Sequence, residues 1–308
     1  MRNILLAGVA SILIINPSAG QGCSDAGVCT IHSFKDNRAQ VADQAGFKNE
    51  LVTGFSFGKG ERSVSYYTPY LQYTRHVSAH TSASLKFTYN AISGELASTA
   101  GAGDLFLSLD HRVDRKSKWK KSIFAGFKIP LADAGLSKNA IELPMPYQPG
   151  LGTTDLILGL NIARDAWGAT IAWQQPLNAS NENAFLPENY PGIPLANRYL
   201  PTNQFGRKAD LVARLTYDIP SKTKLSLRPG LLGIYHVGDD TYVDINKTRR
   251  EIDKSAGLTL NGVLFAGYNF NDKNRIELSV GTPFVVRTNR PDGLTRSFVT
   301  SLEYRILF

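Results

Sequence analysis

Two glycine-rich segments that end in aspartate are the residues of this chain whose types and spacing first suggest chemistry. GAGDLFLSL begins at Gly101, and GLGTTDLILGL begins at Gly150. A glycine-rich loop binds phosphate when it opens a helix, because free backbone N–H groups and the helix dipole then point at the anion. Here both segments lead into strand-like patterns, and Asp104 and Asp155 would repel a phosphate group. We therefore expect no nucleotide site, and instead two places where a loop opens into a strand.

A serine between two histidines is a second candidate for chemistry. Ser78 is flanked by His76 and His80. Nucleophilic catalysis needs a serine within hydrogen-bond reach of a histidine that a third group orients. The segment 76–80 is expected to be a short turn on the periplasmic side, away from the outer rim where barrel lipid hydrolases carry such sites. We therefore expect no enzyme and no catalytic residues, and keep lipid hydrolysis as the least favoured alternative.

The two cysteines are the third candidate. Cys23 and Cys29 bracket a short flexible loop, and His32 lies nearby. Three possible ligands without tight pairing do not match a structural zinc site, which uses four. We expect neither a metal nor a cofactor. In an oxidising compartment a local disulfide between Cys23 and Cys29 is favoured, although the spacing alone does not establish it.

The N-terminus predicts export. Residues 1–20 contain Arg2, an apolar run over 4–15 and small residues over 17–20, which is the pattern of a cleaved signal peptide. The apolar run is too short for a membrane-spanning helix, which needs roughly 20 residues. A lipidated Cys23 is a less favoured alternative. Residues 21–47 are expected to form a periplasmic segment that either plugs a barrel lumen or hangs free.

Alternating hydrophobicity is the elementary pattern of the rest of the chain. At the C-terminus, SFVTSLEYRILF has an apolar face and a mixed face that includes Glu303 and Arg305. A period of two indicates a strand with one apolar and one polar side. The apolar face ends in Tyr304, Ile306 and Phe308, which resembles the signal that the barrel-assembly machinery recognises in outer-membrane proteins.

The same pattern recurs along the chain and predicts about twelve strands, so that residues 48–308 would form an all-β, closed, antiparallel transmembrane β-barrel. Its connections alternate in length, with short turns on the periplasmic side and long loops outside, apart from a short outer loop at 58–62. The expected turns are 76–80, 114–120, 163–166, 220–223 and 271–274, and the expected long loops are 90–103, 131–152, 176–207, 237–255 and 287–295. A soluble β-sandwich is less favoured, because its loops do not alternate in this way.

Charged residues on the polar faces are expected to line the lumen. They could form ion-pair ladders that hold a narrow barrel shut, or create a transverse field for polar solutes. Mutual pairing without further function is the alternative. The candidates for the lumen and its selectivity are Asp104, Asp155, Asp110, Arg112, Lys128, Arg214, Arg228, Glu277 and Arg305.

Several motifs resemble one family of outer-membrane proteins. GAGDLFLSLDHRV, FAGFKIPLAD, QPGLGTTDLILGL, WGATIAWQQPL and LFAGYNFNDKNRIELSVGTPF together resemble the phenol-degradation meta-pathway (MetA) transporter-like family. The chain departs from the family pattern at Ile129–Asp133, where the usual glycine of the Leu/Ile-Pro-x-Gly step is replaced, and GLGTTD stands where GTGSTD is commoner. The resemblance implies passive uptake of small hydrophobic or aromatic molecules. The alternative is a non-conducting structural or adhesive barrel.

The net charge of the protein and its expected location indicate which partners it contacts. The net charge of +8 and the cluster Lys247–Arg250 suit contact with anionic lipopolysaccharide. We expect the protein to lie in the outer membrane of a Gram-negative-type bacterium. Outer-membrane lipids, the barrel-assembly machinery and a small-molecule solute would be its partners, and its location excludes nucleic acid.

Overall fold

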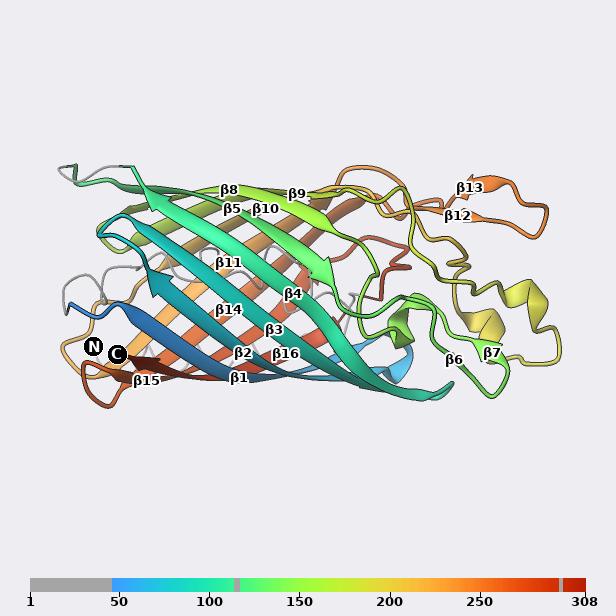
Figure 1. The fold of residues 1–308 in the computed structure, drawn as a ribbon, viewed down its shortest axis with the longest axis horizontal. Helices are drawn as coiled ribbons and strands as arrows, with labels where there is room; N and C mark the ends of the chain where they lie inside the picture. The colour runs from blue at the N-terminus through green and yellow to red at the C-terminus, as the bar shows by residue number, and fades with distance from the viewer. Residues whose placement is uncertain (1–45, 114–116, 294–295) are drawn as a thin grey trace, which may run out of the picture.

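Twelve antiparallel strands form a closed barrel in the computed structural model, which describes residues 46–113, 117–293 and 296–308 (Figure 1). The prediction of the fold is therefore confirmed. The expectations for the signal peptide, for the Cys23–Cys29 disulfide and for nearly all of the segment 21–47 lie outside the described residues. The barrel strands are β1 Asn49–Gly60, β2 Ser65–His76, β3 Thr81–Ser93, β4 Ser98–Arg112, β5 Lys120–Pro130, β8 Asp155–Arg164, β9 Trp167–Pro176, β10 Asp210–Tyr217, β11 Leu225–His236, β14 Gly257–Asn269, β15 Asn274–Val285 and β16 Arg296–Leu307.

The barrel closes where its first strand pairs with its last. Strand β1 pairs antiparallel with β16, and the backbone N–H of Asn49 donates to the carbonyl oxygen of Phe308 at 2.9 Å. An even number of strands brings both ends of the barrel to the same side, as Figure 1 shows. Closure leaves no sheet edge, so every strand has two hydrogen-bonded neighbours, which a strand surrounded by lipid requires.

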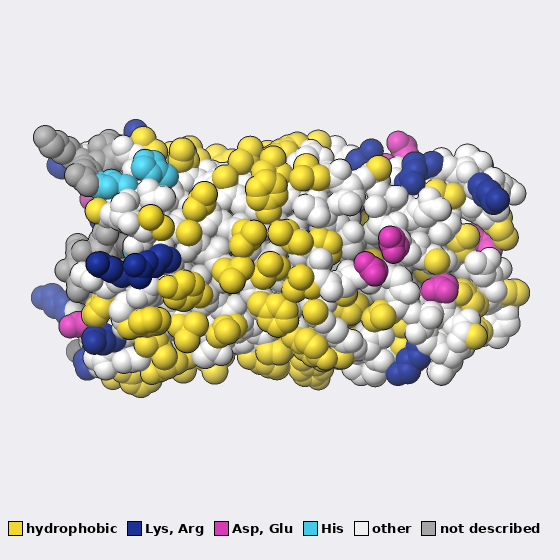
Figure 2. Space-filling view, viewed as in Figure 1, with side chains coloured by type: hydrophobic (Ala, Val, Ile, Leu, Met, Phe, Trp, Pro, Cys, Tyr) yellow, Lys and Arg dark blue, Asp and Glu magenta, His cyan; other side chains and the backbone are white. Residues whose placement is uncertain are grey.

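The outward face of the barrel is apolar. Phe55, Leu71 and Ile171 are each exposed by about half of their surface, at 46%, 51% and 56%. Figure 2 shows such side chains as a broad band around the middle of the barrel, with charged side chains gathered toward the two ends. Aromatic rings mark the end with the short turns, where Trp167 packs on Tyr217 with ring centres 4.8 Å apart. This distribution is that of a lipid-facing barrel surface with an aromatic girdle.

One expected long loop is wrong. Instead of a loop over 90–103, β3 and β4 extend outward as a hairpin whose turn covers only 94–97, closed by the Gly94 N–H donating to the Ala97 carbonyl at 3.0 Å. Gly101 and Gly103 therefore lie inside β4 and do not open it. Near Gly103 the pairing with β3 shifts between Phe87 and Tyr89, so this glycine sits at a bulge. The second glycine segment does precede its strand, β8, as expected.

The remaining long loops fold over the outer mouth of the barrel. We call residues 131–154, 177–209, 237–256 and 286–293 the outer cap. It contains the small strands β6 Ser137–Lys138, β7 Ile141–Glu142, β12 Thr241–Val243 and β13 Arg249–Glu251, and the 3-10 helices η3 Met145–Tyr147, η4 Pro187–Asn189 and η5 Ala196–Arg198; a further one, η2 Glu61–Ser63, follows β1. Within the described ranges, no helix is long and apolar enough to cross a bilayer.

The outer cap has its own apolar interior. One cluster joins Tyr147 and Phe185 to Ile92 at the outer end of β3, and a second contains Met145 and Phe205. Tyr147, Phe185 and Phe205 have no exposed surface. Because loops rarely bury aromatic side chains completely, the cap is a packed layer and not a set of independent loops.

Candidate functional site: the lumen and its outer cap

A buried ion pair lies at the outer end of the lumen. Strands β5 and β8 pair so that Lys128 stands opposite Asp155, and the Lys128 Nζ lies 3.0 Å from the Asp155 Oδ2. Neither side chain has any exposed surface. Thr153 donates to the other carboxylate oxygen at 2.7 Å, and Gln174 donates to Asp155 as well. Asp155 and Lys128, both expected in the lumen wall, are buried at the outer ends of their strands, and the structure pairs them with each other.

Arg207 extends this pair into a network. It approaches from the segment just before β10, and its guanidinium lies 3.9 Å from Asp155, 3.8 Å from Asp292, and in contact with Asp210. Burial alone would lower the pKa of this guanidinium, but the carboxylates around it raise the pKa above its ordinary value. Arg207 therefore stays charged and links the barrel wall to the outer cap.

His236 and Arg287 complete the network. The two ring nitrogens of His236 lie 2.7 Å from Asp210 and 2.8 Å from Asp240, and a ring that donates to two carboxylates carries both protons. Arg287 lies 3.6 Å from Asp240 and also contacts Asp292. Burial raises the pKa of Asp292, but Arg287 and Arg207 more than reverse this and hold the pKa below its ordinary value. The outer ion network consists of Lys128, Asp155, Arg207, Asp210, His236, Asp240, Arg287 and Asp292.

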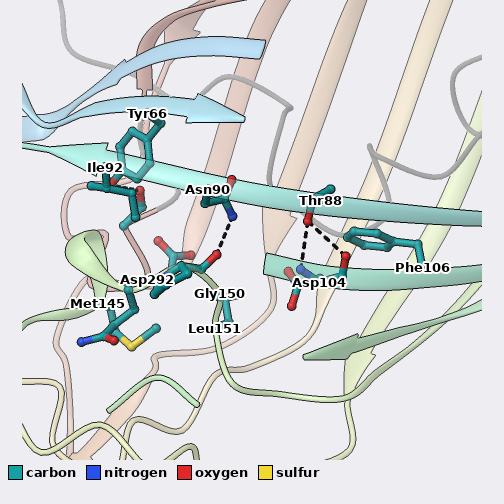
Figure 3. A pocket seen from close by; sticks show the side chains of 13 residues that line it. Tyr66, Thr88, Asn90, Ile92, Asp104, Phe106, Met145, Gly150, Leu151 and Asp292 are labelled. Atoms are coloured by element: carbon teal, nitrogen blue, oxygen red, sulfur yellow. Dashed lines mark hydrogen bonds between the residues drawn. The ribbon is translucent and has the colours of Figure 1, made fainter. Parts of the chain in front are cut away.

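Asp104 lies beside this network, in the wall of a small cavity (Figure 3). Its backbone N–H donates to the Thr88 hydroxyl at 2.9 Å. Its side chain is buried, and its Oδ1 has no hydrogen-bond partner within the described part of the chain. Asn90 closes the cavity by donating to the Pro149 carbonyl of the cap. At about 40 Å³ the cavity holds only a few water molecules, so it is not a passage for an organic solute.

Directly below the network, one side of the lumen wall carries a row of apolar side chains. We call the cluster of buried, inward-facing residues on seven consecutive strands, from β4 to β14, the lumen strip. It consists of Phe106, Phe124, Ile157, Ala172, Val212, Leu232 and Ile234, with Val263 packed against them. The polar faces of the strands were expected to line the lumen, and further along these same faces the inward side chains are polar, for example Ser108, Asn161 and Arg214. The strip is an apolar row within these faces. The Phe124 ring lies over Gly159 of the neighbouring strand, which leaves no room for a Cβ there.

The strip and the network are stacked along the same strands. Ile157, Val212 and Ile234 each lie two residues below Asp155, Asp210 and His236, and side chains two apart share one face of a strand. The opposite wall of the lumen is polar. It presents the buried side chains Ser56, Gln72, Thr74, Lys86 and Ser301. The lumen therefore has an apolar strip on one side, facing a polar wall, beneath a charged outer ring.

The other candidates lie deeper in the lumen or at its periplasmic end. Arg228 of β11 lies 3.7 Å from Glu277 of β15, and Arg275 hydrogen-bonds the same Glu277 at 2.7 Å. Arg305 of β16 lies 3.6 Å from Glu50 and stands opposite Arg275 in the β15–β16 register. Arg214 lies 6.0 Å from the centre of the Phe265 ring, which Arg228 also approaches. The remaining two lie elsewhere: Asp110 accepts a hydrogen bond from Ser122 at 3.0 Å, and Arg112 ends β4.

Six members of the outer ion network were not among the residues predicted from the sequence. Asp210 and His236 could have been found, because they occupy inward positions at the outer ends of their strands. Arg207, Asp240, Arg287 and Asp292 lie in loops, where no periodic pattern shows which way a side chain faces. Among the residues that the structure describes, no group of three or more His, Cys, Asp or Glu side chains is arranged to hold a metal ion.

The Ser78 segment forms a turn between β2 and β3. The Ser78 hydroxyl accepts hydrogen bonds from the backbone N–H groups of His80 and Thr81 at 3.2 and 3.1 Å. The hydroxyl therefore stabilises the turn, in the manner common for serine.

The geometry defines the chain as a transmembrane β-barrel of the outer-membrane type. No family model and no curated protein matches the sequence. Among solved structures, the chain is similar to the COG4313 outer membrane channel from Pseudomonas putida F1, with 15% identity, a TM-score of 0.60, and coverage of 85% of this chain and 96% of that chain. The CymD monoaromatic hydrocarbon channel matches with 13% identity over 96% of this chain and 99% of that chain, at a TM-score of 0.44. The first likeness shows the fold.

Proposed function

We propose that the protein is an outer-membrane channel for the passive uptake of small hydrophobic or aromatic molecules. The observation that carries this proposal is the lumen strip. Open porins line their lumen with polar side chains, because water fills it. The strip residues are buried in the described conformation. Once an opening motion uncovers them, they present an apolar surface on seven neighbouring strands, which lowers the free energy of an apolar solute inside the barrel. A barrel of twelve strands also leaves a lumen of intermediate width.

Passage along the strip requires the outer cap to move. The outer ion network ties the strand ends of β5, β8, β10 and β11 to three cap segments, through Arg207, Asp240 and the Arg287–Asp292 pair. In this proposal the described conformation is the closed one. Opening exchanges the ion pairs of Arg207 and Arg287 for water and exposes the upper edge of the strip.

The location and the partners of the channel are part of the same proposal. It lies in the outer membrane of a Gram-negative bacterium, in contact with lipids and with lipopolysaccharide through exposed cations such as Arg249 and Arg250. Tyr304, Ile306 and Phe308 act as its assembly signal. It is a member of the MetA-like transporter group in this proposal, and it has no enzymatic role.

Uptake of labelled toluene by porin-deficient cells tests the proposal, because an intact lipopolysaccharide leaflet slows unassisted entrance of apolar molecules. Cells with the wild-type protein are expected to take up toluene faster than cells without it. The double variant Ile157→Thr, Val212→Thr places two hydroxyl groups on the strip with the loss of one methyl group, and is expected to remove most of the gain. Thr216→Val, an inward change on β10 below the strip, is the matched control. Equal uptake with and without the wild-type protein would contradict the proposal.

A non-conducting structural or adhesive barrel is the second candidate. The apolar interior of the outer cap favours it, because Tyr147, Phe185 and Phe205 are completely buried over the mouth. Planar-bilayer recording separates the two functions. If neither the wild-type protein nor a variant with a weakened cap conducts, the second candidate is supported.

A further inference from the structure

Arg228 is a buried cation whose hydrogen-bonding capacity the described residues do not use. The residue is 8% exposed, and its Nε has no hydrogen-bond partner within the described part of the chain. Its ion-pair contact with Glu277 is 3.7 Å long, which exceeds hydrogen-bond distance. A buried guanidinium without hydrogen bonds is costly, since its desolvation is not offset. Such a group is suited to bind an anion.

The carboxylate near Arg228 is shared with a second guanidinium. Arg275 donates to Glu277 at 2.7 Å and also to the Ser226 hydroxyl at 2.9 Å, so Glu277 is held by Arg275 in preference to Arg228. Two guanidinium groups thus face one carboxylate, and the group Arg228, Arg275 and Glu277 carries a formal charge of +1. A further carboxylate would balance this charge.

The surroundings of Arg228 are aromatic and apolar. Its guanidinium carbon lies 4.7 Å from the centre of the Phe265 ring, which stands directly opposite in the β11–β14 register. Val263 occupies the next inward position on β14 and packs against the lumen strip. An apolar surface therefore runs from the strip down to the guanidinium, so that the body of a ligand and its charged group find different partners.

We propose that Arg228 is the anion-binding residue of a lumen site for small aromatic carboxylates. Guanidinium binds a planar carboxylate through two parallel hydrogen bonds, which fixes its orientation. The aromatic ring of such a ligand then lies toward Phe265 and Val263, and the carboxylate takes the place of Glu277 beside Arg228. This inference rests on the proposed channel function, and it names a substrate class beyond neutral hydrophobic molecules.

Equilibrium binding of benzoate to the purified full-length protein in detergent tests the site without requiring passage. We expect benzoate to bind more tightly than acetate, which lacks the ring, and than benzyl alcohol, which lacks the charge. Arg228→Gln is expected to weaken benzoate binding by about tenfold or more, because a hydrogen-bonded charge is lost. Arg228→Lys keeps the charge but not the planar pair of donors, so it is expected to restore only part of the affinity.

Arg112→Gln is the matched control, since it removes an arginine at the periplasmic end of β4, a strand that does not adjoin β11, β14 or β15. Its benzoate affinity is expected to equal that of the wild type. The heat-induced shift in gel migration confirms for each variant that the barrel is folded. The inference is overturned if benzoate does not bind, or if Arg228→Gln binds it as tightly as Arg112→Gln. In that case toluene uptake still tests the channel function separately. Conversely, benzoate binding without any toluene uptake would contradict the channel function and leave the anion site standing.

Discussion

Lys128 and Asp155 form a 3.0 Å ion pair in which neither side chain reaches solvent, and Arg207 adds a second cation 3.9 Å from the same carboxylate. Removing one partner of a buried pair leaves an uncompensated charge. We expect Asp155→Asn to lower the free energy of unfolding by about 3–5 kcal/mol, read from the urea midpoint of the folded band in a gel.

The matched control for that variant is Asp165→Asn. Asp165 lies 3.5 Å from Arg164 in a turn, but its side chain is 81% exposed. Exposed pairs contribute about 0–1 kcal/mol, so the control is expected to unfold close to the wild-type midpoint. Equal destabilisation by both substitutions would mean that the outer ion network does not stabilise the barrel.

The outer cap is expected to open in acid. Arg287 and Arg207 hold the pKa of Asp292 below its ordinary value, so its ion pairs contribute stability that is complete above the unfolded pKa, near about 4, and is lost as pH falls through the still lower folded pKa. Bilayer conductance should therefore stay constant from pH 8 to pH 5 and rise below about pH 4. Asp292→Asn removes the titrating group and is expected to give raised conductance throughout; a rise already complete at pH 6 would exclude Asp292 as its cause.

Phe205 is expected to hold the cap closed without holding the barrel together. It has no exposed surface and packs in the cluster with Met145. Phe205→Ala should weaken the cap by about 3–5 kcal/mol, the usual cost of truncating a buried phenylalanine. Protease cleavage within residues 177–209 is then expected to speed up while the heat-induced gel shift persists. Ile245→Ala, at a residue 62% exposed in the cap, is the control and should leave cleavage unchanged.

The C-terminal phenylalanine is expected to matter for assembly more than for stability. Phe308 is 54% exposed on the lipid-facing side, and its backbone, not its side chain, bonds Asn49 at the seam. Phe308→Ser should lower the amount of assembled protein in cells, measured by membrane fractionation, while refolding in detergent stays near normal. Leu302→Ser, on the same face of β16, tests whether any apolar loss has this effect.

The strands were predictable because apolar and polar residues alternate along nearly all strands of the barrel. The outer part of the β3–β4 hairpin was not, because Ala91, Ala97 and Ala100 are small and make the alternation weak. The lumen strip was missed for the opposite reason. In LFLSL and LILGL, apolar residues occupy both faces, so the outward leucines hide the inward Phe106 and Ile157.

The residues of the candidate site also fall into a group that could be predicted from the sequence and a group that could not. Asp104, Asp155 and Lys128 could be assigned to the inner face of their strands from the sequence, because strand position fixes the direction of a side chain. Their partners Arg207 and Asp292 come from cap loops that meet the wall only after folding. The local sequence of a loop does not show which strand residues it will contact.

The ratio of toluene uptake to arabinose uptake, measured in the same cells, tests the central claim most directly. A passage that follows the lumen strip should favour toluene in cells carrying the wild-type protein, and the Ile157→Thr, Val212→Thr variant should lower the ratio while Thr216→Val leaves it unchanged. A wild-type ratio no higher than that of cells without the protein would contradict the account.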